Sequence, residues 1–452
     1  MTPARRHRAL RRRWWPLVAL GAALAAAPAQ AQDETAQQSS GLWLQSTYNW
    51  QQHDRLRSPY ASPNSLQPGR ERMYTFSATL MGGLRVWDGG ELYANAELVQ
   101  GVPFSGALVG LGTFTNGEIT RAAGSHPSAY RQRLFLRQTW NLGGGREAVE
   151  PDLNQLAGTV DRDRFVLTAG NFATLDVFDG NRYAKDPRTQ FMNWANWTYA
   201  AYDYAADARG FGWGAAGEWY QGDWVLRFGR MTGPVRPNEQ ATDLALARHH
   251  GDQLELEHAH VLAGQPGKLR LLAWRNRAVL ARFDDAQRWL QAHPGTDPKT
   301  IFAVRGAERS KFGLGLSLEQ AVSDQLGGFL RLMRADGRTE TQAFTEVDRS
   351  LSGGLLLKGG GWGRGGDSVG LALARNGLSP QRRDFLAAGG LSYFIGDGAL
   401  RYRSEAVLET FYSLALGHGA WITLDWQRIA HPAYNADRGP LNVAALRLHA
   451  EH

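Results

Sequence analysis

The 452-residue chain contains no cysteine. Disulfide bonds, thiol nucleophiles and cysteine-ligated metals are therefore excluded. Long hydrophobic runs are missing after residue 31, so no later segment reaches the roughly 18 apolar residues of a transmembrane helix. Lysine is scarce too, because the chain holds only Lys185, Lys268, Lys299, Lys311 and Lys358. Arginine supplies the other basic side chains, and its planar guanidinium stays charged when it is partly desolvated.

The first 31 residues have the composition of an export signal. Six arginines between Arg5 and Arg13 precede an apolar stretch, and Ala29-Gln30-Ala31 offers a small-x-small cleavage site. The apolar stretch is short for a retained anchor, so we expect residues 1–31 to be removed and 32–452 to form a single domain. Without these six arginines the 50 basic residues fall to 44, against 43 acidic ones. The basic isoelectric point is therefore no argument for nucleic acid, and we expect no nucleic-acid partner.

The rest of the chain repeats amphipathic segments with a two-residue period. In 441–452, Ala444, Leu446 and Leu448 share one face while Arg447 and His449 share the other. Such alternation indicates strands with one apolar face. Here the segments are joined alternately by short and long connections, as in outer-membrane barrels. We therefore predict an all-β fold, a transmembrane antiparallel β-barrel of about 16 strands, with a soluble secreted β-protein as the alternative.

We count 17 such segments, whereas a barrel with both ends in the periplasm needs an even number. Either 399–403 is a short additional strand or one segment is not a strand. A brief helix is expected over 284–292, within an outer loop. The segments lie near 42–50, 74–86, 91–98, 130–140, 163–171, 210–220, 223–230, 252–261, 267–276, 309–320, 325–335, 349–358, 367–376, 386–396, 402–414, 419–428 and 441–452.

Catalytic and metal signatures are weak. The chain has neither a G-x-S-x-G elbow nor an H-E-x-x-H motif, so we predict no enzyme and no cofactor. A barrel hydrolase with serine and histidine on one wall is the alternative, because such sites are recognised by geometry. A histidine cluster invites a metal interpretation, but its last two members share a face with leucines, as interfacial aromatics do, and we predict no metal site. The cluster consists of His249, His250, His258 and His260.

The candidate binding residues lie on two neighbouring predicted strands. Arg131, Arg133 and Arg137 are assigned to one polar face, opposite a face with Glu97, Asn95 and Tyr93. Arginine donors with glutamate and asparagine acceptors would replace water around hydroxyl groups at a constriction, and Tyr93 with Phe135 would stack on a sugar ring. The alternative is a charge ladder that only holds the lumen wall in shape. Trp194 and Trp197 would stack on sugar in an outer loop or serve in packing there.

Several long segments have a distinctive composition. They are 112–119 (GTFTNGEI), 133–139 (RLFLRQT), 175–194 (LDVFDGNRYAKDPRTQFMNW), 202–210 (YDYAADARG), 408–410 (LET) and 431–440 (HPAYNADRGP). With these segments the chain resembles the OprB-type carbohydrate-selective porins of Gram-negative bacteria, over nearly all of 32–452.

The resemblance implies a 16-stranded barrel in the outer membrane that passes glucose and similar small sugars through a constriction rich in arginine with acidic partners. Glu118 would join that ring if its long loop folds inward. The expected partners are small sugars and outer-membrane lipid or lipopolysaccharide, and the oligomeric state stays open between monomer and trimer. A general or anion-preferring porin is the alternative function. The terminal His452 departs from the aromatic residue, usually phenylalanine, at the end of such barrels, which puts assembly efficiency in doubt.

Overall fold

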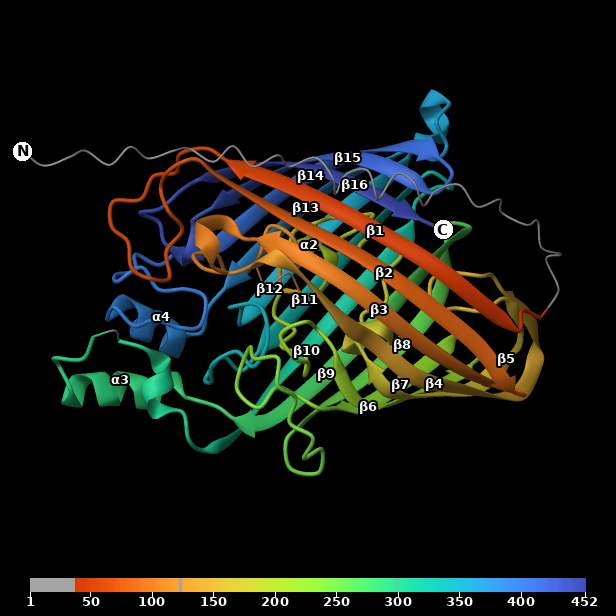
Figure 1. The fold of residues 1–452 in the computed structure, drawn as a ribbon, viewed down its shortest axis with the longest axis horizontal. Helices are drawn as coiled ribbons and strands as arrows, with labels where there is room; N and C mark the ends of the chain where they lie inside the picture. Colours follow the sequence, from red (N-terminus) through yellow and green to blue (C-terminus); the bar gives the residue numbers. More distant parts are fainter. Residues whose placement is uncertain (1–36, 122–123, 298) are drawn as a thin grey trace, which may run out of the picture.

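The computed structural model describes residues 37–121, 124–297 and 299–452. The expected export signal lies outside these residues. Sixteen antiparallel strands close into a barrel in which consecutive strands pair and β1 pairs with β16 (Figure 1). The predicted fold class is confirmed. The strands are β1 (Ser40–His53), β2 (Glu71–Trp87), β3 (Gly90–Val102), β4 (Gly124–Val149), β5 (Gly158–Phe172), β6 (Gly212–Gln221), β7 (Trp224–Met231), β8 (His250–Leu262), β9 (Gln265–Val279), β10 (Glu308–Ala321), β11 (Leu326–Ala335), β12 (Arg349–Lys358), β13 (Ser368–Gly377), β14 (Glu405–Gly417), β15 (Ala420–Ala430) and β16 (Leu441–Glu451).

Helices occur only in the connections of the described chain. None of them is long and apolar enough to cross a membrane. The helix expected over 284–292 is confirmed as α3. The α-helices are α2 (Trp194–Trp197), α3 (Phe283–Ala292) and α4 (Pro380–Ala387), and the 3-10 turns are η1 (Phe104–Gly106), η2 (Thr174–Asp176), η3 (Ile301–Val304), η4 (Gly359–Trp362) and η5 (Pro432–Tyr434).

Long and short connections lie at opposite ends of the barrel. Short turns such as 88–89 and 263–264 alternate with long segments such as 103–123, 173–211 and 378–404. In Figure 1 the long connections with α3 and α4 gather at one end of the strands. Outer-membrane barrels carry short turns on the periplasmic side and long loops outside, so the α3–α4 end is the extracellular one.

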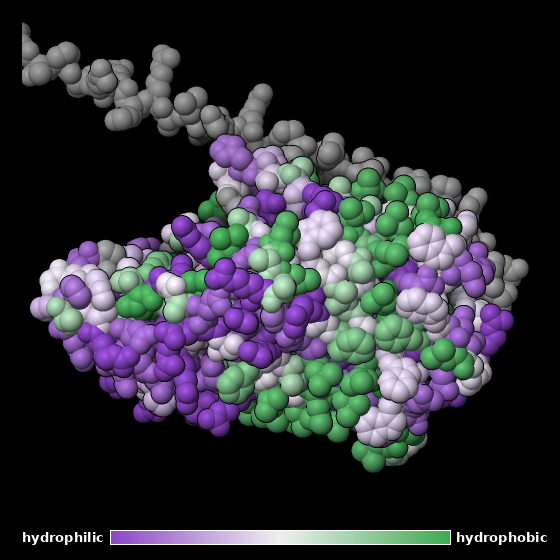
Figure 2. Space-filling view, turned by 90° about the horizontal axis from the view of Figure 1, so that it is seen from below, coloured by the Kyte–Doolittle hydropathy of each residue, from purple (hydrophilic) through white to green (hydrophobic). Residues whose placement is uncertain are grey.

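The outer face of the barrel is apolar around its middle. Leu256, Leu271, Leu316 and Leu332 are consecutive register partners on the outward face of β8, β9, β10 and β11. Figure 2 shows the corresponding band of hydrophobic side chains between two hydrophilic ends. Inside, the alternate positions are polar: Arg447 of β16 has no exposed surface, as the alternation of that strand predicts. Lipid-facing and lumen-facing residues therefore follow the period-two pattern.

The segment 386–396 is not a strand, and this prediction was wrong. Residues 380–387 form α4, which begins where the Ser379 side chain accepts a hydrogen bond from the Arg382 amide and Pro380 takes the first helical position. Leu386 and Ile395, two apolar residues of this segment, are instead buried under the extracellular loops. With this segment removed, the 16 remaining ones correspond to the observed strands.

The outward leucines lead to a prediction about stability. Replacing Leu271, in the middle of the apolar band, by arginine should lower the free energy of unfolding by about 2–4 kcal/mol, because a charge at the bilayer midplane loses its hydration. The control is Leu262→Arg beside the 263–264 turn, for which the cost should be about 0–1 kcal/mol. Reversible denaturant unfolding in phospholipid vesicles, followed by tryptophan fluorescence, measures both. Equal costs at the two positions would show that Leu271 does not face the hydrocarbon.

Candidate functional site

The long connection between β5 and β6, residues 173–211, lies inside the barrel and is fastened to the wall at several points. Arg447 donates hydrogen bonds to the carbonyls of Pro187 and Gln190, both at 2.8 Å. On the opposite side Arg331 donates to the carbonyl of Ala184 at 2.6 Å. The wall thus supplies charged donors to loop carbonyls that would otherwise be buried without partners.

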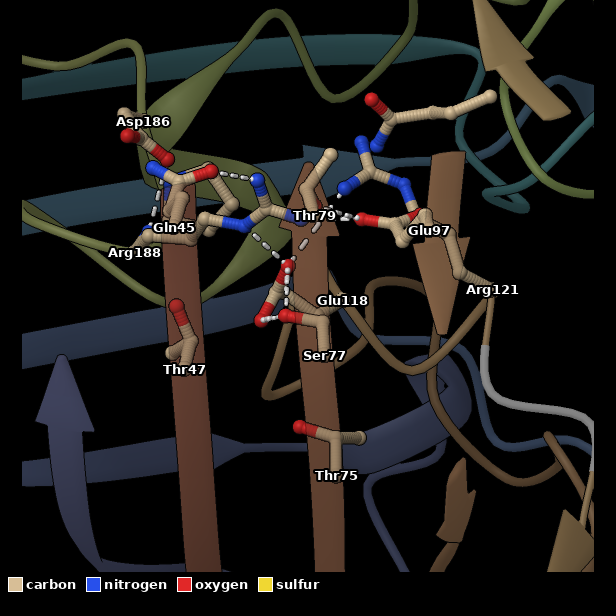
Figure 3. A network of polar contacts seen from close by, with 12 residues as sticks. Gln45, Thr47, Thr75, Ser77, Thr79, Glu97, Glu118, Arg121, Asp186 and Arg188 are labelled. Atoms are coloured by element: carbon tan, nitrogen blue, oxygen red, sulfur yellow. Dashed lines mark hydrogen bonds and ion pairs between the residues drawn. The ribbon is translucent and has the colours of Figure 1, made fainter. Parts of the chain in front are cut away.

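Arg188 of this loop forms a network of ion pairs and hydrogen bonds with the wall and with a second loop. Its guanidinium bonds Glu97 of β3 at 2.8 Å, Glu118 of the 103–123 loop, and Gln45 of β1 (Figure 3). Thr79 of β2 also donates to Glu97 at 2.9 Å. One guanidinium therefore joins two loops and two strands directly, and Thr79 adds β2 through Glu97.

The three charged side chains of this contact are buried. Glu97 and Glu118 are each only 2% exposed, and Arg188 is 8% exposed. Burial by itself lowers the pKa of Arg188, but the two adjacent carboxylates more than reverse this and raise it, so the guanidinium stays charged. Glu97 and Glu118, both expected in the constriction, therefore anchor the loops through Arg188, and Glu97 does not pair with Arg131, Arg133 or Arg137.

Arg133 forms a second fixed ion pair. Its Nε and one terminal nitrogen donate to the two carboxylate oxygens of Asp176 at 2.8 and 2.7 Å, which is the bidentate arrangement that fixes guanidinium orientation. Asp176 also accepts from the Ala173 amide at 2.9 Å. Burial raises the pKa of Asp176, but Arg133 outweighs this effect and holds the pKa below its ordinary value. Arg133 is thereby positioned in the lumen.

Arg131 lies on the other side of the barrel wall, contrary to the prediction. The register shifts between Asn95, which faces Arg133, and Ala96, which faces Arg131, so β4 carries an extra residue at Gln132. A β-bulge of this kind reverses the face of the residues beyond it. Arg131 is therefore exposed outside, with its guanidinium 5.0 Å from the Trp213 ring.

The aromatic pair expected to stack on sugar is covered. Tyr93 and Phe135 stack at 5.0 Å between centroids, and the guanidinium of Arg137 lies 5.2 Å from the Tyr93 ring. The Tyr93 hydroxyl donates to Glu91, and Tyr93 has no exposed surface. The Tyr93 ring is therefore covered, and the Arg137 side chain that packs on it faces the lumen in its place. Asn95 is likewise buried and donates to Gln132 at 3.4 Å.

Three cavities adjoin one another along the lumen. The extracellular one, of about 320 Å³, shares Thr120 and Phe344 with a middle cavity of about 540 Å³. The middle cavity shares four residues with a vestibule of about 900 Å³ that reaches the short turns. These four residues line the junction of the two cavities, called the neck below: Arg137, Gln155, Asp176 and Lys185.

The middle cavity is lined by two chemically different kinds of side chain. Arg121, Arg133 and Arg209 supply guanidinium donors. Largely buried aromatic residues also line it: Phe344 stacks on Trp194 at 4.9 Å between centroids and lies 4.9 Å from Tyr204. Burial lowers the pKa of Lys185 at the neck, and the nearby Asp179 and Asp176 offset this only in part. Fixed donors beside apolar side chains suit a solute that carries both hydroxyl and C–H groups.

Comparison with known proteins agrees with this geometry. Residues 64–451 match the model of the carbohydrate-selective porin, OprB family. The chain belongs to the OprB family of porins. Its place is therefore the Gram-negative outer membrane.

A solved porin structure shows the same architecture. The high-pH structure of Pseudomonas putida OprB has a TM-score of 0.64 and 14% identity, covering 92% of this chain and 94% of that one. At this identity the likeness shows the fold alone. The Acinetobacter baumannii channel DcaP matches at TM-score 0.48 and 8% identity, covering 91% and 97%. No curated protein matches the chain.

The histidine cluster of this OprB-family chain is dispersed. His249 contacts Asp243, and His258 stacks on Trp224 at 4.2 Å between centroids. Within residues 37–121, 124–297 and 299–452, no three or more histidine, aspartate or glutamate side chains are grouped to hold a metal.

Sequence reasoning missed the loop residues that shape the pore. Asp176, Lys185 and Arg188 all belong to the 175–194 segment whose composition carried the family resemblance. That resemblance was the available signal, because a loop has no periodicity from which the direction of a side chain can be read. Arg121 and Arg209 were also missed, for the same reason.

The buried Arg188 leads to the second prediction. Arg188→Ala removes the only ion-pair partner of Glu97 within the described residues and leaves Glu118 with Arg121 alone, at 3.5 Å. This should weaken attachment of the loops by about 3 kcal/mol. Single-channel recording should then show a larger and noisier conductance. Arg188→Lys keeps the charge without the planar fork, so its conductance should lie between those of wild type and Arg188→Ala. Quiet, unchanged conductance of Arg188→Ala would contradict the role of Arg188 as an anchor.

Proposed function

We propose that this chain lets small, glucose-like sugars diffuse passively through the outer membrane, with selection in the middle cavity and its neck. The observation that carries the proposal is that guanidinium donors and apolar side chains line the same cavity. Membership of a carbohydrate-selective family supports the same solute class.

The proposed mechanism is an exchange of hydration. A sugar entering from the extracellular cavity passes Phe344 and leaves water behind as its hydroxyl groups accept hydrogen bonds from Arg133 and Arg209. Its C–H groups pass the apolar lining of the cavity, to which Leu175, Trp194 and Tyr204 contribute. Since Asp176 already holds Arg133, the donor needs no rearrangement. The contacts stay weak enough for the sugar to leave, as conduction requires.

A substitution pair tests this proposal. Arg133→Ala should raise single-channel conductance in planar bilayers and weaken block by glucose roughly ten-fold, the loss expected for a charged hydrogen-bond donor. Arg131→Ala is a closely matched control, because it removes the same side chain two residues away on the outer face. It should leave conductance and block unchanged. Equal behaviour of the two variants would place sugar selection elsewhere.

One observation favours a second candidate function, an anion-preferring pore. Arg137 and Lys185 line the neck, and within the described residues neither has a carboxylate ion-pair partner. Uncompensated positive charge at a neck favours anions. The reversal potential in a salt gradient separates the two: strong anion preference together with no block by any sugar would support this candidate over the sugar pore.

A further inference from the structure

Three arginines stand side by side on the outer face of the barrel, at the extracellular ends of β11, β12 and β13. Arg334 of β11 is the direct register partner of Arg349 of β12. Arg375 of β13 faces Leu351, two residues along from Arg349, so Arg349 and Arg375 are diagonal neighbours. All three side chains are exposed. Residues related in this way lie roughly 5–8 Å apart on one face of a sheet.

Nothing of opposite charge accompanies them. Among residues 37–121, 124–297 and 299–452, no carboxylate forms an ion pair with any of the three, and the nearest polar contact is the Tyr402 hydroxyl, 3.5 Å from Arg349. A fourth arginine, Arg383 of α4, lies 4.6 Å from the centroid of the same Tyr402 ring. Like charges directly opposite in a sheet are destabilising. The cluster therefore costs stability unless an anion joins it.

Two other outward arginines of this barrel form ion pairs with a carboxylate on the neighbouring strand. Arg230 of β7 bonds Asp252 of β8 at 2.6 Å, and Arg277 of β9 bonds Glu308 of β10 at 2.9 Å. Pairing is thus available on this surface. Outward Arg72, Arg275 and Arg428 lack a carboxylate too, but each donates to a neutral side chain of a neighbouring strand. Arg334, Arg349 and Arg375 differ in that three guanidinium groups adjoin one another.

The position of the cluster defines the kind of anion. On the periplasmic side of the three arginines the outward residues are exposed leucines, which belong to the apolar band. On the other side lie the extracellular loops and α4 (Figure 1). An anion at this height is attached to a molecule of the outer leaflet, and a guanidinium fork fits a phosphate in two-point contact. The leucines are Leu330, Leu332, Leu351, Leu371 and Leu373.

We propose that Arg334, Arg349 and Arg375 form a binding site for the phosphate groups of lipopolysaccharide, whose acyl chains lie along the leucines below. The bound phosphate neutralises the facing Arg334–Arg349 pair, and Arg383 with Tyr402 closes the extracellular side of the site. This role concerns the outer wall and does not depend on what passes through the lumen.

Purified full-length protein tests the proposal by binding to phosphorylated lipid A in detergent. The triple variant Arg334→Gln, Arg349→Gln, Arg375→Gln should bind on the order of 100-fold more weakly, since each arginine near an anionic surface contributes roughly a five-fold factor. The matched control replaces three other outward arginines by glutamine: Arg131, Arg230 and Arg277. It should bind as wild type does. Equal weakening of the two triple variants would overturn the site.

The source of the phosphate is tested by three further ligands. Dephosphorylated lipid A should bind the wild type as weakly as lipid A binds the triple variant. Inorganic phosphate at millimolar concentration should not displace lipid A, and phosphatidylglycerol should bind more weakly than lipid A. Equal affinity for phosphatidylglycerol would overturn the assignment to lipopolysaccharide, and cluster-dependent self-association without lipid would assign the surface to a second copy of the chain.

One substitution should shift the melting temperature in opposite directions without and with lipid A, which a purely structural role would not produce. Without lipid A, Arg349→Gln removes a like-charge repulsion and should raise the melting temperature. With lipid A present, the same variant loses stabilisation by the ligand and should melt below the wild type. Correct folding is checked by circular dichroism. If the order of melting temperatures is the same with and without lipid A, the proposal is wrong.

Discussion

The buried contact of Arg188 with Glu97 and Glu118 is the constraint on which the interior of this porin depends. A 16-stranded barrel closed by backbone pairing has a lumen wider than a sugar, so selectivity requires material inside it. Residues 173–211 and 103–121 supply that material, and Arg188 holds both segments against β1 and β3. Removing one of these charged side chains leaves a buried charge with fewer partners, so it should loosen the attachment of both loops together.

The side chains that line the space between the fixed loops and the barrel wall determine the chemistry of the pore. Asp176 belongs to the 173–211 loop and orients Arg133. At the neck, Arg137 packs on the buried ring of Tyr93. These side chains act as donors held by other groups, so a passing solute meets a preformed surface. The outer wall uses arginine differently: Arg334 and Arg349 face each other without a carboxylate in the described chain, in a position where lipid phosphate is the natural counter-ion.

Periodicity predicted the barrel because each strand must satisfy lipid on one face and water or loop on the other. It placed Arg447 in the lumen correctly. It failed at Arg131, because one bulged residue at Gln132 reverses the alternation and no local pattern announces the bulge. It also failed at 386–396, where the apolar Leu386 and Ile395 are buried by loops. Arg188 was beyond periodic reasoning, since the loop has no regular geometry and its partners come from residues 45, 97 and 118.

The central claim is that Arg188 and Glu97 act as one unit to maintain sugar selection. A double-mutant cycle on the glucose-block constant measures this most directly, with Arg188→Ala, Glu97→Ala and the double variant recorded in planar bilayers. We expect each single variant to weaken block and the double variant to be no worse than the more affected single one. Additive losses, or block that stays at the wild-type level in all three variants, would contradict the account.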